Sequence, residues 1–161
     1  MTLRPSRLLG SRGFTFIELL VVTTLLLILA SAVMPLARVT MQRQREAELR
    51  RSLREMRTAI DRYKLAVDQG QIGGSDVRLG SEGYPPALET LVKGVNQVGR
   101  LDHKLKFLRR IPMDPLTNST DWGLRAYGDK PDSTSWGGGN VFDVYSKAEG
   151  TALDGTKYRD W

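Results

Sequence analysis

The chain contains no cysteine and only one histidine among its 161 residues. It can therefore form no disulfide, hold no cysteine-bound zinc ion and use no thiolate nucleophile. It also offers no usable serine–histidine–aspartate set and no phosphate-binding loop. The glycines of SWGGGN, residues 135–140, neither follow an apolar strand nor open a helix, as a nucleotide fingerprint requires. We therefore expect no enzymatic activity, and a small domain of this chain needs a staple other than a disulfide.

The formal net charge of +6 is unevenly distributed. The later of two arginine clusters, within residues 38–57, alternates with Glu46, Glu48 and Glu55. This alternation indicates a solvated helix face rather than a binding patch, and we expect no nucleic-acid partner. The first cluster precedes a long apolar block and consists of Arg4, Arg7 and Arg12.

The apolar block, residues 14–37, reaches roughly twenty residues, enough to cross a hydrocarbon core of about 30 Å as a helix. With basic residues before it, the positive-inside rule places the amino terminus in the cytoplasm and the rest of the chain beyond the membrane. One carboxylate, Glu18, lies within the block. Because a charge in a span is unfavourable by roughly 2.5–3.5 kcal/mol, Glu18 is a candidate functional residue that needs a partner.

The chain offers two candidate positions for cleavage by a peptidase. The small residues ASA, 30–32, resemble a secretory cleavage site, but the apolar run is longer than an ordinary signal and continues through Pro35 without a turn-rich break. Cleavage after Gly13 would instead remove the leader arginines and make Phe14 the new amino terminus. Glycine offers an open backbone to an enzyme, and Phe14 is a membrane-anchoring residue.

The residues RGFTFIELLVV, 12–22, resemble the prepilin signal of type IV pilins and their relatives. The resemblance implies that a membrane prepilin peptidase removes residues 1–13 and methylates the Phe14 amine. If the helices then pack side by side, Glu18 of one subunit can meet the amino terminus of a neighbour, an attraction of about 4 kcal/mol at ~4 Å. The alternative is a glutamate at the membrane interface that snorkels or stays protonated.

Beyond Pro35, apolar residues at alternating spacings of four and three predict one helix to about Asp68, ended by Gln69-Gly70. Pro35 removes one backbone hydrogen bond and should kink or loosen this rod, and the resemblance implies local melting there during assembly. We expect residues 14–37 to form the transmembrane and filament-core part, and residues 38–69 an amphipathic continuation. The predicted stripe is Leu49, Leu53, Met56, Ile60, Tyr63 and Val67.

Residues 70–161 are expected to form a globular domain. YPPALETLVKG, 84–94, predicts a short helix, and LKFLRRIP, 105–112, a short apolar element. Three aromatic or β-branched runs predict strands of one small antiparallel sheet on the helix stripe, which gives an α+β, pilin-like fold. These runs are WGLRAY (122–127), NVFDVYS (140–146) and TKYRDW (156–161).

The order YPP, FLRRIPMDPLT, WGLR and NVFDVYSKAEGTALDG, ending in RDW, is similar to the major pseudopilins of type II secretion systems. That resemblance implies a single-pass inner-membrane subunit with a periplasmic domain, polymerised into a periplasmic filament that drives protein export. The implied partners are other copies of the chain, minor pseudopilins, prepilin peptidase, the inner-membrane assembly platform with its secretion ATPase, and membrane lipid. Residues 129–140 depart from this pattern, because the loop is longer and richer in glycine.

The same resemblance implies a calcium ion in SKAEGTALDG, residues 146–155. Calcium takes six to eight oxygens, and a tight glycine-bearing loop can supply them. The candidates are Glu149, Thr151 and Asp154, with the carbonyl of Ser146. Ordinary turn residues are the alternative, and a weaker second candidate comprises Asp129, Asp132 and Asn140.

Two other functions remain open at this point. A major or minor subunit of a type IV pilus, serving adhesion, motility or DNA uptake, would share the leader and the helix. A single-span membrane protein with a periplasmic binding domain would never polymerise. The absence of a cysteine pair and the RIPMDP and LDGTKYRDW segments favour the secretion system over the pilus.

Overall fold

The computed structural model describes residues 13–73, 77 and 80–161, without the side chains of residues 32–36 and 101–102. The chain divides into two compact units, Met1–Met41 and Gln42–Trp161, each described here by itself. The predicted α+β class is confirmed. In order, the elements are α1 (Phe16–Asp68), α2 (Leu88–Lys93), β1 (Val95–Gln97), β2 (Arg100–Leu105), β3 (Gly123–Arg125), β4 (Asp143–Tyr145) and the 3-10 helix η2 (Tyr158–Asp160).

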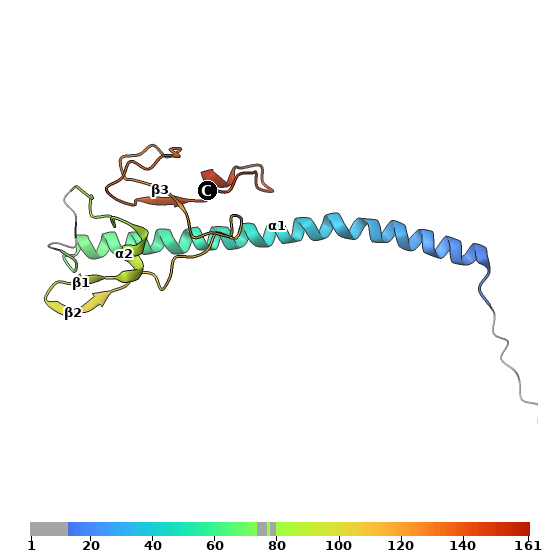
Figure 1. Ribbon diagram of the computed structural model, residues 1–161, viewed down its shortest axis with the longest axis horizontal. Coiled ribbons are helices and arrows are strands. Elements are labelled where there is room, and N and C mark those ends of the chain that lie inside the picture. The colour runs from blue at the N-terminus through green and yellow to red at the C-terminus, as the bar shows by residue number, and fades with distance from the viewer. Residues whose placement is uncertain (1–12, 74–76, 78–79) are drawn as a thin grey trace, which may run out of the picture. The chain divides into compact units, whose positions relative to one another are not determined.

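Helix α1 runs from the first unit into the second and is continuous through Pro35 (Figure 1). Its end is a Schellman motif. The Gln71 N–H donates to the Ala66 carbonyl and the Gly70 N–H to the Val67 carbonyl, both at 2.9 Å. Gly70 has a φ of 68°, which glycine adopts without strain. The predicted stop at Gln69-Gly70 is therefore confirmed.

The predicted apolar stripe of α1 forms one wall of the core in the second unit. Five of its six members are at most 2% exposed, and Val67 is partly buried against them. Side chains from α2 and the strands cover this stripe, because an amphipathic helix must bury its apolar face against another element. The five fully buried members are Leu49, Leu53, Met56, Ile60 and Tyr63.

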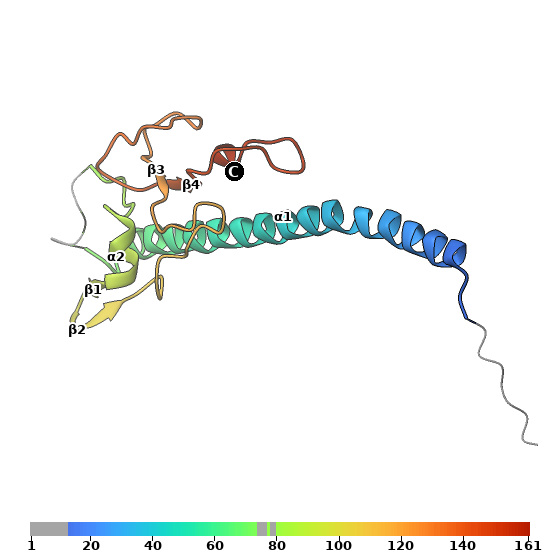
Figure 2. The same cartoon turned by 45° about the vertical axis from the view of Figure 1, so that its right-hand side comes forward.

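The described strands form two separate two-stranded antiparallel sheets, where we had predicted one sheet. In β3 and β4, Gly123 is opposite Tyr145, whose ring covers the place where a Cβ on Gly123 would be. Figures 1 and 2 agree that the β1–β2 hairpin lies on one side of the carboxyl half of α1, with β3, β4 and η2 on the other side. The two sheets therefore pack on opposite sides of the same helix.

Two predictions about the elements were wrong. TKYRDW is not a strand: it contains η2 and a single bridge between Thr151 and Lys157. Its aromatic residues, Tyr158 and Trp161, are three apart, which is the spacing that superposes side chains in a 3-10 turn and not the alternation of a strand. The β1–β2 hairpin was missed, because a bulge shifts its register and its sequence has little alternation.

Candidate functional site

The predicted cleavage position lies immediately before α1. Residues 13–15 are not helical, and Gly13 and Phe14 are exposed. A Cβ added to Gly13 would meet no described atom within 4 Å, and its backbone is not in the left-handed region. Packing in the described chain therefore does not require glycine at position 13. If glycine is required there, the reason is recognition of the Gly13–Phe14 bond by a peptidase, as the sequence predicts.

Glu18 lies in the first turn of α1, and its N–H points to the Thr15 hydroxyl oxygen at 3.4 Å. This is half of a capping box, a signal in TFIE that the sequence interpretation missed. The positive end of the helix dipole favours a carboxylate by about 0.3–1 kcal/mol. That is less than the roughly 2.5–3.5 kcal/mol that opposes a charge in a membrane span, so the helix terminus alone does not offset it.

The apolar side chains of the first unit are exposed around the whole helix. Phe16 is 83% exposed, Leu27 71% and Leu29 68%. The hydroxyls of Thr23, Thr24 and Ser31 donate to carbonyls three or four residues earlier, so these polar groups are satisfied within the helix. A helix that is apolar on every side is expected to be covered by lipid or protein.

We predicted a transmembrane segment at residues 14–37. Within the part of the chain that the structure describes, which leaves out the side chains of residues 32–36, no helix combines the length and apolarity needed to cross a membrane. Pro35, the predicted hinge, is in α1, and its side chain lies outside the description.

Two of the four predicted calcium ligands, Glu149 and Thr151, line one hollow together with Lys147 and Gly150. The buried Ser146 hydroxyl donates to Asp114 at 2.5 Å and accepts the Ala148 N–H, while Glu149 and Thr151 are exposed. Among the described residues, no group of three or more histidine, cysteine or acidic side chains is placed to hold a metal ion.

Asp154 is bound by protein donors instead. Its Oδ2 accepts from Arg50 Nη2 at 2.8 Å, and its Oδ1 accepts the N–H and hydroxyl of Thr156 at 3.0 and 2.6 Å. The Thr156 hydrogen bonds, together with the Arg50 guanidinium, hold the pKa of the Asp154 carboxyl below its usual 3.8. A calcium ion here would compete with these donors for the Asp154 oxygens, and calcium binding stays a prediction.

Charged residues of α1 hold the C-terminal segment, residues 143–161, and Arg50 is the first of those described here. Its guanidinium lies 4.0 Å from the centre of the Trp161 ring, a cation–π contact. The Trp161 indole N–H in turn donates to the Thr156 hydroxyl at 2.6 Å. The aspartate, the threonine and the tryptophan thus close around one arginine.

Glu46 is the second of these residues. Its Oε1 accepts from Gln42 at 3.0 Å, from the Leu153 N–H at 2.9 Å and from the Tyr158 hydroxyl at 2.9 Å. Burial, and the neighbouring Glu46 carboxylate, raise the pKa of Tyr158. Because Glu46 is only 9% exposed, its charge is satisfied by hydrogen bonds rather than by water.

Arg57 is the third. It donates to Asp143 at 2.6 Å and to the carbonyls of Val144 and Trp161 at 3.0 and 2.9 Å. Asp143 is shared with the buried Arg125, which also donates to the carbonyl of Ser133. We call Glu46, Arg50 and Arg57, with their partners in the C-terminal segment, the polar clasp.

Two residues of the weaker calcium candidate, Asp129 and Asn140, accept hydrogen bonds from backbone N–H groups. Asp129 Oδ2 accepts the N–H groups of Ala126 and Gly137 at 2.7 and 3.0 Å, which lower the pKa of Asp129. Asn140 Oδ1 accepts the Tyr127 N–H at 2.9 Å, and Asp132 is exposed. Asp129 and Asn140 thus hold the long loop 129–140 in place through backbone N–H groups.

Asp114 of the MDPLTN turn is a buried residue for which we predicted no role. It is 1% exposed and accepts the Leu116 N–H at 2.8 Å as well as the Ser146 hydroxyl. The turn and the residue after β4 are therefore linked by one carboxylate. Its position before proline in a turn was the available signal.

The comparison with known protein families found a match at the amino terminus. Residues 9–34 match the Prokaryotic N-terminal methylation motif. This match supports the type IV pilin-like family. A motif of this kind is typical of proteins that a prepilin peptidase processes and that assemble from a membrane into filaments. No curated protein and no solved structure matches the chain.

Proposed function

We propose that this chain is a structural subunit of a type II secretion pseudopilus. It is cleaved after Gly13, N-methylated at Phe14 and polymerised into a periplasmic filament that drives protein export. The observation that carries the assembly part is the exposed apolar half of α1, directly after the prepilin signal. This surface needs lipid before assembly and other copies of the helix after it.

Glu18 couples cleavage to assembly in this proposal. The amine that can pair with it does not exist until the Gly13–Phe14 bond is broken. Within one chain the carboxylate already lies at the positive end of its own helix, and it makes no hydrogen bond or ion pair among the described residues. A neighbour's amino terminus supplies the stronger attraction, because a full charge interacts more than a helix dipole.

The localisation and partners follow from the same reading. The chain is a single-pass inner-membrane protein with its amino terminus in the cytoplasm and its globular domain in the periplasm. It meets prepilin peptidase, the assembly platform and its ATPase, minor pseudopilins and further copies of itself. It performs no catalytic step, since the ATPase supplies the work.

Substituting Glu18 by alanine tests the assembly argument. We expect Glu18→Ala to be inserted and cleaved, yet to form few filaments and to lose export in a strain that lacks the wild-type copy. Asp61→Ala is the matched control, because Asp61 is an exposed acid of the same helix beyond the signal. Filaments and export at wild-type level in Glu18→Ala would end the proposal.

The second candidate is a type IV pilus subunit, which the same methylation motif and helix also support. The C-terminal resemblance to pseudopilins and the lack of a cysteine pair favour the secretion system. Deleting the gene separates the two functions: loss of exported proteins from the medium supports the pseudopilus, whereas loss of surface pili, twitching or DNA uptake supports the pilus.

Calcium binding by the loop of residues 146–155 stays a prediction, and Asp154 of this loop is bound to Arg50 and Thr156 in the structure. Binding the ion at the predicted position would require the carboxylate to leave these donors. Titration of the full chain with calcium chloride, followed by its melting temperature, checks this point. A saturable rise that Asp154→Asn abolishes would support the calcium site, and no rise would contradict it.

A further inference from the structure

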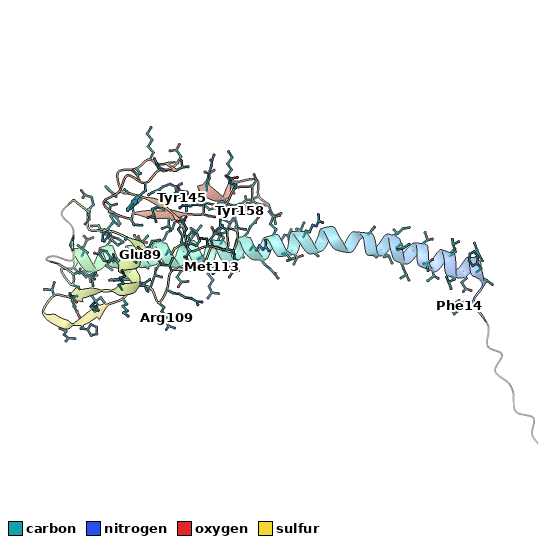
Figure 3. The ribbon with its side chains drawn as sticks, viewed as in Figure 1. Phe14, Glu89, Arg109, Met113, Tyr145 and Tyr158 are labelled. Atoms are coloured by element: carbon teal, nitrogen blue, oxygen red, sulfur yellow. The ribbon has the colours of Figure 1, made fainter. Side chains whose placement is uncertain are left out.

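Two adjacent hollows lie between α1 and residues 107–113 of the second unit. One has a volume of about 540 Å³ and the other about 680 Å³, and Glu55 and Arg109 line both. In Figure 3, Arg109 and Tyr145 lie on opposite sides of α1, so this groove is not on the side of the polar clasp. We call the two hollows together the arginine groove.

Arg51 and Arg54 belong to the cluster that we predicted to be a solvated helix face, and they are two of five arginines that line this groove. None of them forms an ion pair within the described residues, whereas Arg50 and Arg57 of the same helix are both paired. Two glutamates, Glu48 and Glu55, also line it, which leaves a formal excess of three positive charges. The arginines are Arg51, Arg54 and Arg62 of α1, with Arg109 and Arg110.

The groove also presents apolar surface. Met113 is 54% exposed, and Ile111 and Pro112 beside it are half-buried. A ligand that fits must therefore offer negative groups to the guanidiniums and an apolar group to the methionine. Guanidinium is suited to this role, since it binds carboxylates in a fork of two hydrogen bonds and is weakly hydrated.

We propose that the arginine groove docks an acidic, partly apolar polypeptide segment of a partner protein. A polypeptide can place aspartate or glutamate against the arginines and an aliphatic side chain on Met113. A nucleic-acid backbone carries a charge at every nucleotide, and it would bring phosphates against Glu48 and Glu55. The complementary charges should speed association and make it sensitive to salt. The proposal does not depend on filament formation.

The test uses the full chain in a neutral detergent and a fluorescent peptide that alternates glutamate and leucine. We expect Arg51→Glu/Arg109→Glu to weaken binding about tenfold or more, because two attractions become repulsions. Arg43→Glu/Arg45→Glu is the matched control, since it makes the same charge change on exposed residues of α1 outside the groove. It should weaken binding no more than about twofold.

A second pair of measurements examines the apolar part. Met113→Ser should weaken the glutamate–leucine peptide but not a glutamate–serine peptide, and it keeps every charge of the groove. Circular dichroism and the melting temperature establish that each variant is folded. The milder Arg54→Gln/Arg62→Gln variant should also weaken binding, so the test remains available if the charge reversal unfolds the domain.

Three results would overturn the proposal. Equal weakening by the groove and control reversals would show attraction to net charge alone. Equal binding of a glutamine–leucine peptide would remove the carboxylates from the argument. Tighter groove-dependent binding of duplex DNA, or of phosphatidylglycerol vesicles, than of the acidic peptide would assign the groove to a different class of partner.

Discussion

The two units share one helix but differ in how its apolar side chains are satisfied. In the second unit, the α1 stripe is covered by residues far along the chain, and Met56 and Ile60 are fully buried. In the first unit, apolar residues such as Leu26 and Leu29 are exposed on every side of the helix. The second unit is therefore stabilised within one chain, whereas the first needs lipid or other molecules.

The polar groups show the same contrast. The hydroxyls of Thr23 and Thr24 bond to carbonyls of the preceding turn. Glu46 and Arg57 instead bond to residues about a hundred positions away in the sequence, Tyr158 and Trp161. The local bonds satisfy the hydroxyls within one helix, whereas the distant bonds join separate segments of one domain.

The largest expected effect concerns processing of the first unit. Gly13→Val should reduce cleavage of the leader almost to zero, because a branched side chain would replace an open backbone at the bond that the peptidase attacks. Mass spectrometry of the membrane fraction measures the cleaved share. Gly128→Val is the control, since a Cβ on Gly128 also meets nothing within 4 Å. Normal cleavage of Gly13→Val would contradict the assigned site.

Replacing one large apolar side chain by alanine in each unit should affect the free energy of unfolding very differently. Met56→Ala should lower the free energy of unfolding of the globular domain by about 2–5 kcal/mol, because it leaves a cavity in the core. Leu26→Ala should change it by less than about 0.5 kcal/mol. Urea unfolding of both variants in detergent, followed by tryptophan fluorescence, measures the difference. Similar losses in the two variants would remove the distinction.

The polar clasp should have an intermediate effect. Glu46→Gln keeps the size of the side chain but replaces a carboxylate that accepts three donors, so we expect a loss of about 1–3 kcal/mol in the free energy of unfolding. Glu48→Gln, two residues away and exposed, should be nearly neutral. The same urea experiment measures both, and an unchanged Glu46→Gln would show that the clasp adds little stability.

The smallest effect is expected at the exposed end of the clasp. The pKa of Asp154 is lowered in the folded chain by Thr156 and Arg50, so its stabilisation is present above pH 3.8 and is lost as the pH falls through the lowered value. The difference in melting temperature between wild type and Asp154→Asn should therefore shrink in acid. The exposed Asp132→Asn serves as the control. A difference that stays constant with pH would mean that ionisation of Asp154 is not the cause.

Much of the fold could be predicted because its signals are local. The α1 stripe has helical spacing, Gly70 marks the helix end, and Leu88–Lys93 is followed by a glycine, Gly94. A Cβ on Gly94 would come within 2.8 Å of the Leu105 carbonyl oxygen, so its place after α2 also has a packing reason. The hairpin of Val95–Gln97 with Arg100–Leu105 was not predicted, because a strand of three residues has too little pattern to reveal its partner.

The amino-acid sequence by itself indicated the N-terminal methylation motif at residues 9–34, because a motif of this kind is a short linear segment. It also determined which face of α1 is buried. Only the tertiary structure decided that Asp154 is bound by Arg50 and that Arg109 and Arg110 lie beside Arg51. The physical reason is range: helix periodicity is set by neighbours in the chain, whereas pairs of charges depend on which distant segments the core brings together.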